Sequence, residues 1–268
     1  MSGSQAARER GAAYVEAHGD ELSRRSVAVL VGAKPLPDLL GWLVDQQSGD
    51  GRVAFGPGAS AAEDLTSARR VLGALDDLGA LDSIPAQRLG AHLNSVQAAD
   101  GHWGDGCEEE RIFVTGMLAG HLAKSRFARR SLLEAAGGYL GAQWSSERVR
   151  SFQWDALAAY AHFFASSPDD LSDEILQWCG RELERGFRTG HFDAVHTVRV
   201  LAWCGTPVLP GARIAPDELR GALLASQADD GGWLEPSRAE PADRVAHTLD
   251  ALVGLGLLGA VADAPPQA

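Results

Sequence analysis

The sequence predicts an all-α protein built from helical hairpins. Apolar residues recur with helical periodicity through most of the 268 residues, whereas the period-two alternation and β-branched runs of strands scarcely occur. A short loop motif also recurs between helical segments. The segments on its two sides differ in character, because one set is charged on one face and the other is apolar nearly all round.

The composition restricts the class of protein and its partners. Hydrophobic residues make up 45% of the chain, as a packed core requires, and the formal net charge is -12. Because acidic and basic residues are interspersed, nucleic acid and anionic lipid are poor partners. The three cysteines lack CxxC spacing and no apolar stretch is long enough to span a membrane. We therefore expect a cytoplasmic protein without stable membrane insertion.

A loop motif occurs three times, as "QSGDGRVAF" from Gln47, "QAADGHW" from Gln97 and "QADDGGW" from Gln227. Each copy reads Gln, two residues, Asp-Gly and then an aromatic residue. We expect the Gln side chain to donate to carbonyl groups at the end of one helix and to accept from amide groups at the start of the next. Glycine would permit the turn, and the aromatic ring would pack on a neighbouring repeat.

Each repeat is predicted to place one helix before the loop and another after it. The helices before the loop carry charge on one face and are expected to be outer helices, at about residues 5–18, 36–47, 83–97, 127–144, 171–186 and 215–227. The helices after the loop are apolar and rich in small residues and are expected to be inner helices, at about residues 21–33, 62–80, 108–125, 152–167, 191–205 and 242–259. Six such hairpins can close into an α/α toroid. We predict a single domain over residues 1–268, with a tail at about 261–268.

The repeated Gln, Asp-Gly and Trp residues resemble the Gln-Trp motif of the terpenoid cyclase and protein prenyltransferase superfamily, and the squalene-hopene cyclases in particular. The resemblance covers nearly the whole chain and implies a toroid in which the motif stabilises the fold. It therefore implies a structural role for Gln97, Trp103, Gln227 and Trp233. It also implies a class II terpene cyclase-like enzyme, a lyase or isomerase, that begins by protonating an alkene or epoxide.

Polar residues at the starts of the inner helices are the candidate catalytic groups, because all these helices are expected to begin at one rim. In "DAVHT" and "DRVAHT" an acid and a His-Thr pair open consecutive inner helices, which would bring His196 and His247 together. The DxDD motif of class II cyclases is absent, so another aspartate would have to donate the proton. The five candidates for acid-base chemistry are Asp155, Asp193, His196, Asp243 and His247.

Metal sites are the alternative for some of these residues. Prenyltransferase β subunits hold zinc with Asp, Cys and His, which "DGC" at Asp105–Cys107 and "HTLDALVGL" at His247 resemble, but the repeats place these two pieces across the ring. The triad of Asp193, His196 and His247 is the better set, although Val195 stands where the cysteine would be. "DDLSDE" from Asp169 fits a magnesium-binding DDxxD pattern but is typical of a helix start. We expect no metal and no cofactor, with zinc or magnesium as the alternatives.

Aromatic side chains on or beside the inner helices are expected to bind the substrate, because their faces stabilise carbocations and shape apolar cavities. They are Phe113, Phe152, Trp154, Tyr160, Phe192 and Trp203. The preferred hypothesis is cofactor-free, acid-initiated cyclisation or rearrangement of a small apolar or isoprenoid substrate in specialised metabolism, with an Asp donating the proton and a His receiving it. The alternatives are a zinc-dependent prenyltransferase-like subunit, which would need a protein partner, and a noncatalytic toroid that binds lipid or protein.

Overall fold

The computed structural model describes residues 3–53, 55, 61–150, 153–234 and 241–262. Within these ranges all regular secondary structure is helical and no strand is formed, so the predicted all-α class is confirmed. The chain divides into two compact units: unit 1 comprises residues 1–34 and 183–268, and unit 2 comprises residues 35–182. The toroid and the single domain stay predictions. None of the described helices is both long and apolar enough to cross a membrane.

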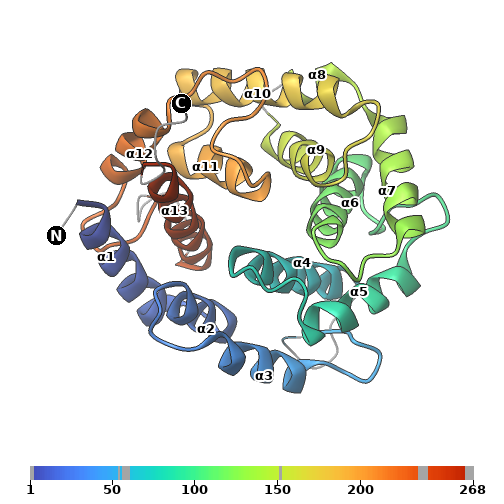
Figure 1. Ribbon diagram of the computed structural model, residues 1–268, viewed down its shortest axis with the longest axis horizontal. Coiled ribbons are helices and arrows are strands. Elements are labelled where there is room, and N and C mark those ends of the chain that lie inside the picture. Colours follow the sequence, from blue (N-terminus) through green and yellow to red (C-terminus); the bar gives the residue numbers. More distant parts are fainter. Residues whose placement is uncertain (1–2, 54, 56–60, 151–152, 235–240, 263–268) are drawn as a thin grey trace. The chain divides into compact units, whose positions relative to one another are not determined.

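Unit 2 is a series of helical hairpins. Its helices are α3 (Leu36–Gln46), α4 (Ala61–Asp77), α5 (Ile84–Val96), α6 (Glu108–Ala123), α7 (Arg130–Gln143), α8 (Ser146–Arg150), α9 (Trp154–Ser166) and the part of α10 (Ser172–Thr189) up to Glu182. These bounds follow the predicted segments closely, except that the short helix α8 was not predicted. Figure 1 shows α6 and α9 side by side, with α4 next to α6.

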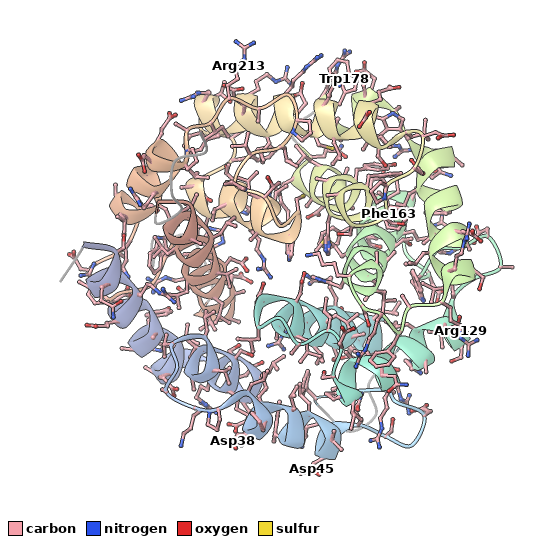
Figure 2. The ribbon with its side chains drawn as sticks, viewed as in Figure 1. Asp38, Asp45, Arg129, Phe163, Trp178 and Arg213 are labelled. Atoms are coloured by element: carbon pink, nitrogen blue, oxygen red, sulfur yellow. The ribbon has the colours of Figure 1, made fainter. Side chains whose placement is uncertain are left out.

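Small residues allow α6 and α9 to approach closely. A Cβ atom added to Gly116 of α6 would lie 2.6 Å from the Cβ of Ala159 on α9. On the other side of α9, Phe163 is buried and points toward α7 (Figure 2), where a Cβ added to Gly137 would lie 3.3 Å from its ring. Burial of α9 on several faces explains why its sequence is apolar nearly all round.

Unit 1 combines the two ends of the sequence. Its helices are α1 (Gly3–His18), α2 (Glu21–Leu30), the rest of α10, α11 (Ala194–Trp203), α12 (Pro216–Ala225) and α13 (Pro241–Ala262). Helix α13 packs on both α1 and α11. Its contact with α11 is close, because a Cβ added to Gly254 would lie within 3.0 Å of Val198.

The motif glutamines connect each loop to a further helix, but through different partners than predicted. The Nε2 atom of Gln97 donates to the carbonyl of Gly101 in its own loop at 2.9 Å and to that of Leu132 in the first turn of α7 at 3.1 Å. Gln47 and Gln227 repeat this pattern with Gly51 and Pro85, and with Gly231 and Ala7. The prediction that the Gln side chain donates to carbonyl groups at the end of the preceding helix is therefore wrong.

The motif tryptophan, instead of the glutamine, donates to a carbonyl group at the end of the preceding helix. The indole Nε1 of Trp103 donates to the carbonyl of Leu93 in the last turn of α5, at 2.9 Å, and its backbone N–H donates to Thr115 Oγ1 at 3.0 Å. Trp233 makes the same pair of bonds, to Leu223 and Thr248. Both side chains are fully buried. The structural role predicted for the motif is consistent with these contacts.

The first copy of the motif departs from the predicted pattern. Val53 pairs with Gln47 in the way that Trp233 pairs with Gln227, so Val53 and not Phe55 occupies the buried position. Phe55 is 39% exposed and stacks on Trp42. The predicted motif aromatic, Phe55, is therefore wrong, because Phe55 lies two residues after the position that Trp103 and Trp233 occupy in the other copies.

The motif glycine is required for two reasons. At all three copies its φ angle is positive, between 85° and 98°, where a residue with a Cβ is strained. A Cβ atom there would also lie within 3.0 Å of a backbone carbonyl oxygen in another helix, which is α5, α7 and α1 for the three copies in turn. The glycines and the residues that they approach are Gly51 and Arg88, Gly101 and Ala135, and Gly231 and Arg10.

For the last copy of the motif, the helix that receives the glutamine hydrogen bond is α1. Gln227 binds the carbonyl of Ala7, and the loop is also held by Arg244 of α13. The Arg244 guanidinium makes two 2.8 Å bonds to Asp230, donates to Tyr14 Oη at 2.9 Å and lies 4.7 Å from the Tyr14 ring centre. The N-terminal helix is therefore an integral part of unit 1.

Candidate functional site

Asp193, His196 and His247 meet at the N-terminal ends of α11 and α13 in unit 1. Asp193 is the N-cap of α11, and its Oδ1 accepts a hydrogen bond from the backbone N–H of His196 at 2.8 Å. Capping by an aspartate is favourable at this position, because the first backbone amides of a helix have no partner within it. The cap fixes the Asp193 side chain beside the first turn of α11.

One carboxylate binds both imidazoles. Asp193 Oδ1 lies 3.0 Å from His196 Nδ1, and Asp193 Oδ2 lies 3.0 Å from His247 Nε2. The two rings are arranged edge to face, with centres 4.7 Å apart. The sequence predicted this proximity from equivalent positions in consecutive repeats. His196 is the accessible imidazole, with a side chain that is 39% exposed, whereas that of His247 is 10% exposed.

The cluster keeps Asp193 ionised. Burial opposes ionisation, but the hydrogen bonds and charges of His196 and His247 outweigh this effect and hold the pKa of Asp193 well below its usual range. A carboxyl group with a lowered pKa is already ionised at neutral pH and has no proton to donate. A proton that this site donates must therefore come from a group other than Asp193.

We expect Asp193→Asn to destabilise the protein more at neutral pH than in acid. The folded-state pKa of Asp193 is lowered, so its contribution to stability is present above the unfolded-state value of about 3.9 and is lost as the pH falls further. Asparagine is also a good N-cap, so the cap itself is retained. Urea unfolding of both proteins at neutral pH and near pH 3 tests this expectation; an equal deficit at both pH values would contradict it.

The other residues considered from the sequence lie outside this cluster. Asp243 is exposed in the first turn of α13, outside the cluster, and Val195 is buried. Cys107 is the N-cap of α6 in unit 2, where its N–H binds Glu110. Asp169 makes local bonds with Leu171 and Ser172 just before α10, consistent with the predicted helix start.

Asp155 and Phe113, two of the predicted site residues, line a cavity of about 380 Å³ in unit 2. The cavity lies at the N-terminal parts of α4, α6 and α9, where apolar side chains such as Leu65 and Val114 lie beside charged ones. The Arg69 guanidinium lies 5.2 Å from the Phe113 ring centre, and the Trp154 ring lies 6.5 Å from the same ring. The volume suits a small ligand. The charged residues of the lining are two arginines, Arg69 and Arg111, and four acids, Asp105, Glu109, Glu110 and Asp155.

The remaining predicted aromatic residues pack in helix–helix contacts rather than in the wall of this cavity. Tyr160 is fully buried, edge to face with Trp144, and burial raises the pKa of its hydroxyl. Phe192 fills the space beside Gly186, and Trp203 packs under the Arg199 guanidinium. Phe152 lies outside the described residues.

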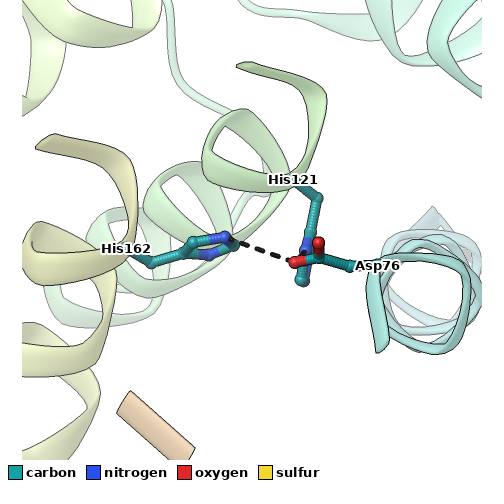
Figure 3. A group of neighbouring side chains, drawn as sticks. All are labelled: Asp76, His121 and His162. Carbon is teal, nitrogen blue, oxygen red and sulfur yellow. Dashed lines mark hydrogen bonds and ion pairs between the residues drawn. The ribbon is translucent and has the colours of Figure 1, made fainter. Parts of the chain in front are cut away.

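A second cluster, which the sequence analysis missed, lies in unit 2 (Figure 3). Asp76 Oδ2 is 2.7 Å from Lys124 Nζ, 3.0 Å from His121 Nδ1 and 3.9 Å from His162 Nε2. Burial opposes the ionisation of Asp76, but the hydrogen bond from His121 and the charges of His121 and Lys124 lower its pKa. The missed signal was a histidine near the end of each of two apolar helices, in "GHLAK" and "YAHFF".

The described part of the chain is thus a set of paired helices with two clusters of one aspartate and two histidines. Two of its loops carry both the motif glutamine and the motif tryptophan. No family model and no curated protein matches the chain. A solved crystal structure of a protein from Actinoplanes is similar, with a TM-score of 0.63 and 13% sequence identity. The match covers 96% of this chain and 99% of that one. At this identity the likeness indicates a shared fold.

Proposed function

We propose that the protein is a terpene cyclase-like enzyme, an isomerase or lyase, that cyclises or rearranges a small apolar or isoprenoid substrate at the Asp193, His196 and His247 cluster. The observation that carries the proposal is one ionised carboxylate hydrogen-bonded to two imidazoles. Such a group can hold a proton on an accessible histidine near neutral pH. The Gln-Trp loops, which resemble those of the terpenoid cyclases, support the class of substrate.

The proton donor differs from the preferred hypothesis. Because Asp193 is held as a carboxylate, it orients the imidazoles and stabilises their protonated forms. His196, the accessible ring, donates and later recovers the proton. An imidazolium is a weaker acid than a carboxylic acid, so the substrate is expected to carry a basic oxygen, such as an epoxide, rather than an isolated alkene.

The proposed reaction conserves protons. His196 transfers a proton to the epoxide oxygen as the C–O bond breaks, which leaves a hydroxyl group and an electron-deficient carbon. A double bond of the same substrate attacks this carbon and closes a ring. The resulting cation loses a C–H proton to the His196 imidazole, which restores the enzyme, so the product is an isomer of the substrate.

We expect His196→Gln to lower turnover of an epoxy-isoprenoid at least about 100-fold, because general acid-base catalysis contributes about 10²–10⁴-fold. Products are separated by chromatography and identified as isomers by mass spectrometry. Asp193→Asn and His247→Gln should also reduce turnover. His102→Gln, which alters a histidine paired with Asp100 in a motif loop, is the matched control.

Two further variants locate the donor. Asp155→Asn and Asp243→Asn should retain activity if His196 is the donor. Loss of activity only in Asp155→Asn would move the reaction to the cavity in unit 2. Full activity in every variant of the cluster would mean that Asp193, His196 and His247 are structural.

A zinc-dependent, prenyltransferase-like function is the second candidate, and one observation favours it. One ligand atom from each of Asp193, His196 and His247 lies within 4.8 Å of the others, and these are residue types that bind zinc. A metal there would keep an open position for a thiol or water. Elemental analysis decides between the two, because zinc that is lost in both His196→Gln and His247→Gln would support this candidate and displace the first.

A further inference from the structure

Asp76, His121 and His162 come from the C-terminal parts of three different helices, α4, α6 and α9 (Figure 3). One ligand atom from each residue lies within 4.8 Å of the others. The ligands of a tetrahedral zinc ion, at about 2.0–2.2 Å from the metal, are roughly 3.3 Å apart. The observed separations from Asp76 Oδ2, 3.0 Å to His121 Nδ1 and 3.9 Å to His162 Nε2, bracket this value. We propose that these three residues bind a zinc ion that cross-links α4, α6 and α9.

The packing of α6 against α9 makes room for the imidazoles. Gly120 precedes His121, and a Cβ atom at Gly120 would lie 2.6 Å from His162 Nδ1. The two rings are edge to face with centres 4.4 Å apart, and their side chains are 1% and 0% exposed. The absence of a side chain at Gly120 therefore leaves room for the His162 ring to lie against His121, next to Asp76.

The chemistry of the group suits a divalent cation. A zinc ligand must be deprotonated, and an aspartate carboxyl group is ordinarily ionised at neutral pH. Two enclosed imidazoles supply the nitrogen ligands that zinc favours. The Asp76 side chain is 14% exposed, so a water molecule can reach the site as the fourth ligand. Unlike Asp193, Asp76 lies in the last turn of its helix and does not cap a helix start.

Lys124 competes with the metal for Asp76. Its ammonium group lies 2.7 Å from Asp76 Oδ2, so two cations would share one carboxylate if it stayed in place. Lys124 follows the last residue of α6, and its side chain is 24% exposed, so the ammonium can turn toward solvent when zinc binds. Removing this charge should strengthen zinc binding, whereas a purely structural ion pair would give no such gain.

The test is zinc titration of the full chain against a coloured chelator at about pH 7.5, where imidazole is mostly neutral. Wild-type protein should bind one equivalent at this cluster. Affinity should fall at least about 100-fold in His121→Asn and in His162→Asn, since loss of even an outer-shell partner costs about 10–100-fold. Lys124→Met should bind about 10-fold more tightly, a change similar to the effect of one nearby charge on a pKa.

Control variants separate this site from others. His92→Asn alters a histidine on α5 and should keep the zinc, and His247→Gln should keep the equivalent that His162→Asn loses. If the buried variants do not fold, as judged by circular dichroism, Lys124→Met decides the question on an otherwise intact cluster. The proposal is overturned if wild-type protein binds no zinc, if Lys124→Met binds it no more tightly, or if only His247→Gln releases it.

Discussion

Trp233→Ala is expected to lower the free energy of unfolding by about 3–5 kcal/mol, as truncation of a buried aromatic residue does. The Trp233 ring is fully buried, and its Nε1 satisfies the carbonyl of Leu223 at the end of α12. The ring also fills the space opposite Gly11 of α1, where an added Cβ would lie 2.8 Å from it. Equilibrium unfolding in urea measures the change.

Trp178→Ala is the matched control, because Trp178 is only partly buried and its ring contacts the guanidinium groups of Arg150 and Arg181. Its loss should cost much less. The folded fraction of Trp233→Ala should retain turnover, since the indole does not contact the Asp193 cluster through any of these bonds. Wild-type stability with lost turnover would reverse the structural assignment of the motif.

Gly101→Ala is expected to cost about 2–5 kcal/mol, the sum of two independent penalties. The φ angle of Gly101 is 98°, which strains a residue with a Cβ, and the new methyl group would collide with the carbonyl oxygen of Ala135. Because this oxygen belongs to the backbone of α7, neither side can move cheaply. The melting temperature and urea unfolding both report the loss.

Gly104→Ala separates the two penalties. Gly104 has a similar φ angle of 90°, but the nearest atom to an added Cβ is Leu65 Cδ1 at 3.9 Å. This variant should show only the backbone strain, about 1–2 kcal/mol. Equal losses in the two variants would mean that the close approach of the loop to α7 contributes nothing.

The helices could be predicted because their signals are local. Apolar periodicity and loop residues located nearly all of them, while the five-residue helix α8 is too short to show a period. The partners of the motif residues could not be predicted in the same way. The distances from Gln97 to Leu132 and from Trp103 to Leu93 depend on how the hairpins pack, and sequence spacing does not report packing.

The two clusters differ in how far the sequence revealed them. Asp193, His196 and His247 stand at equivalent positions of consecutive repeats, so the repeat itself indicated their proximity. His121 and His162 lie near the ends of apolar helices, where a single histidine looks like any other core residue, and Asp76 is one of two adjacent aspartates. The packing of α4, α6 and α9 brings these residues together.

The composition of unit 1 from both ends of the chain has a consequence for biosynthesis. Residues 35–182 form unit 2 from one continuous segment, which can fold as soon as it leaves the ribosome. Helices α1 and α2 are synthesised before unit 2 and α13 after it, so the face of α1 that packs on α13 stays uncovered until α13 emerges. Helices α1 and α2 thus reach their final contacts only after unit 2 has been synthesised. During this interval their exposed apolar faces can bind a chaperone, and in a stalled or truncated chain these faces would stay exposed and promote aggregation.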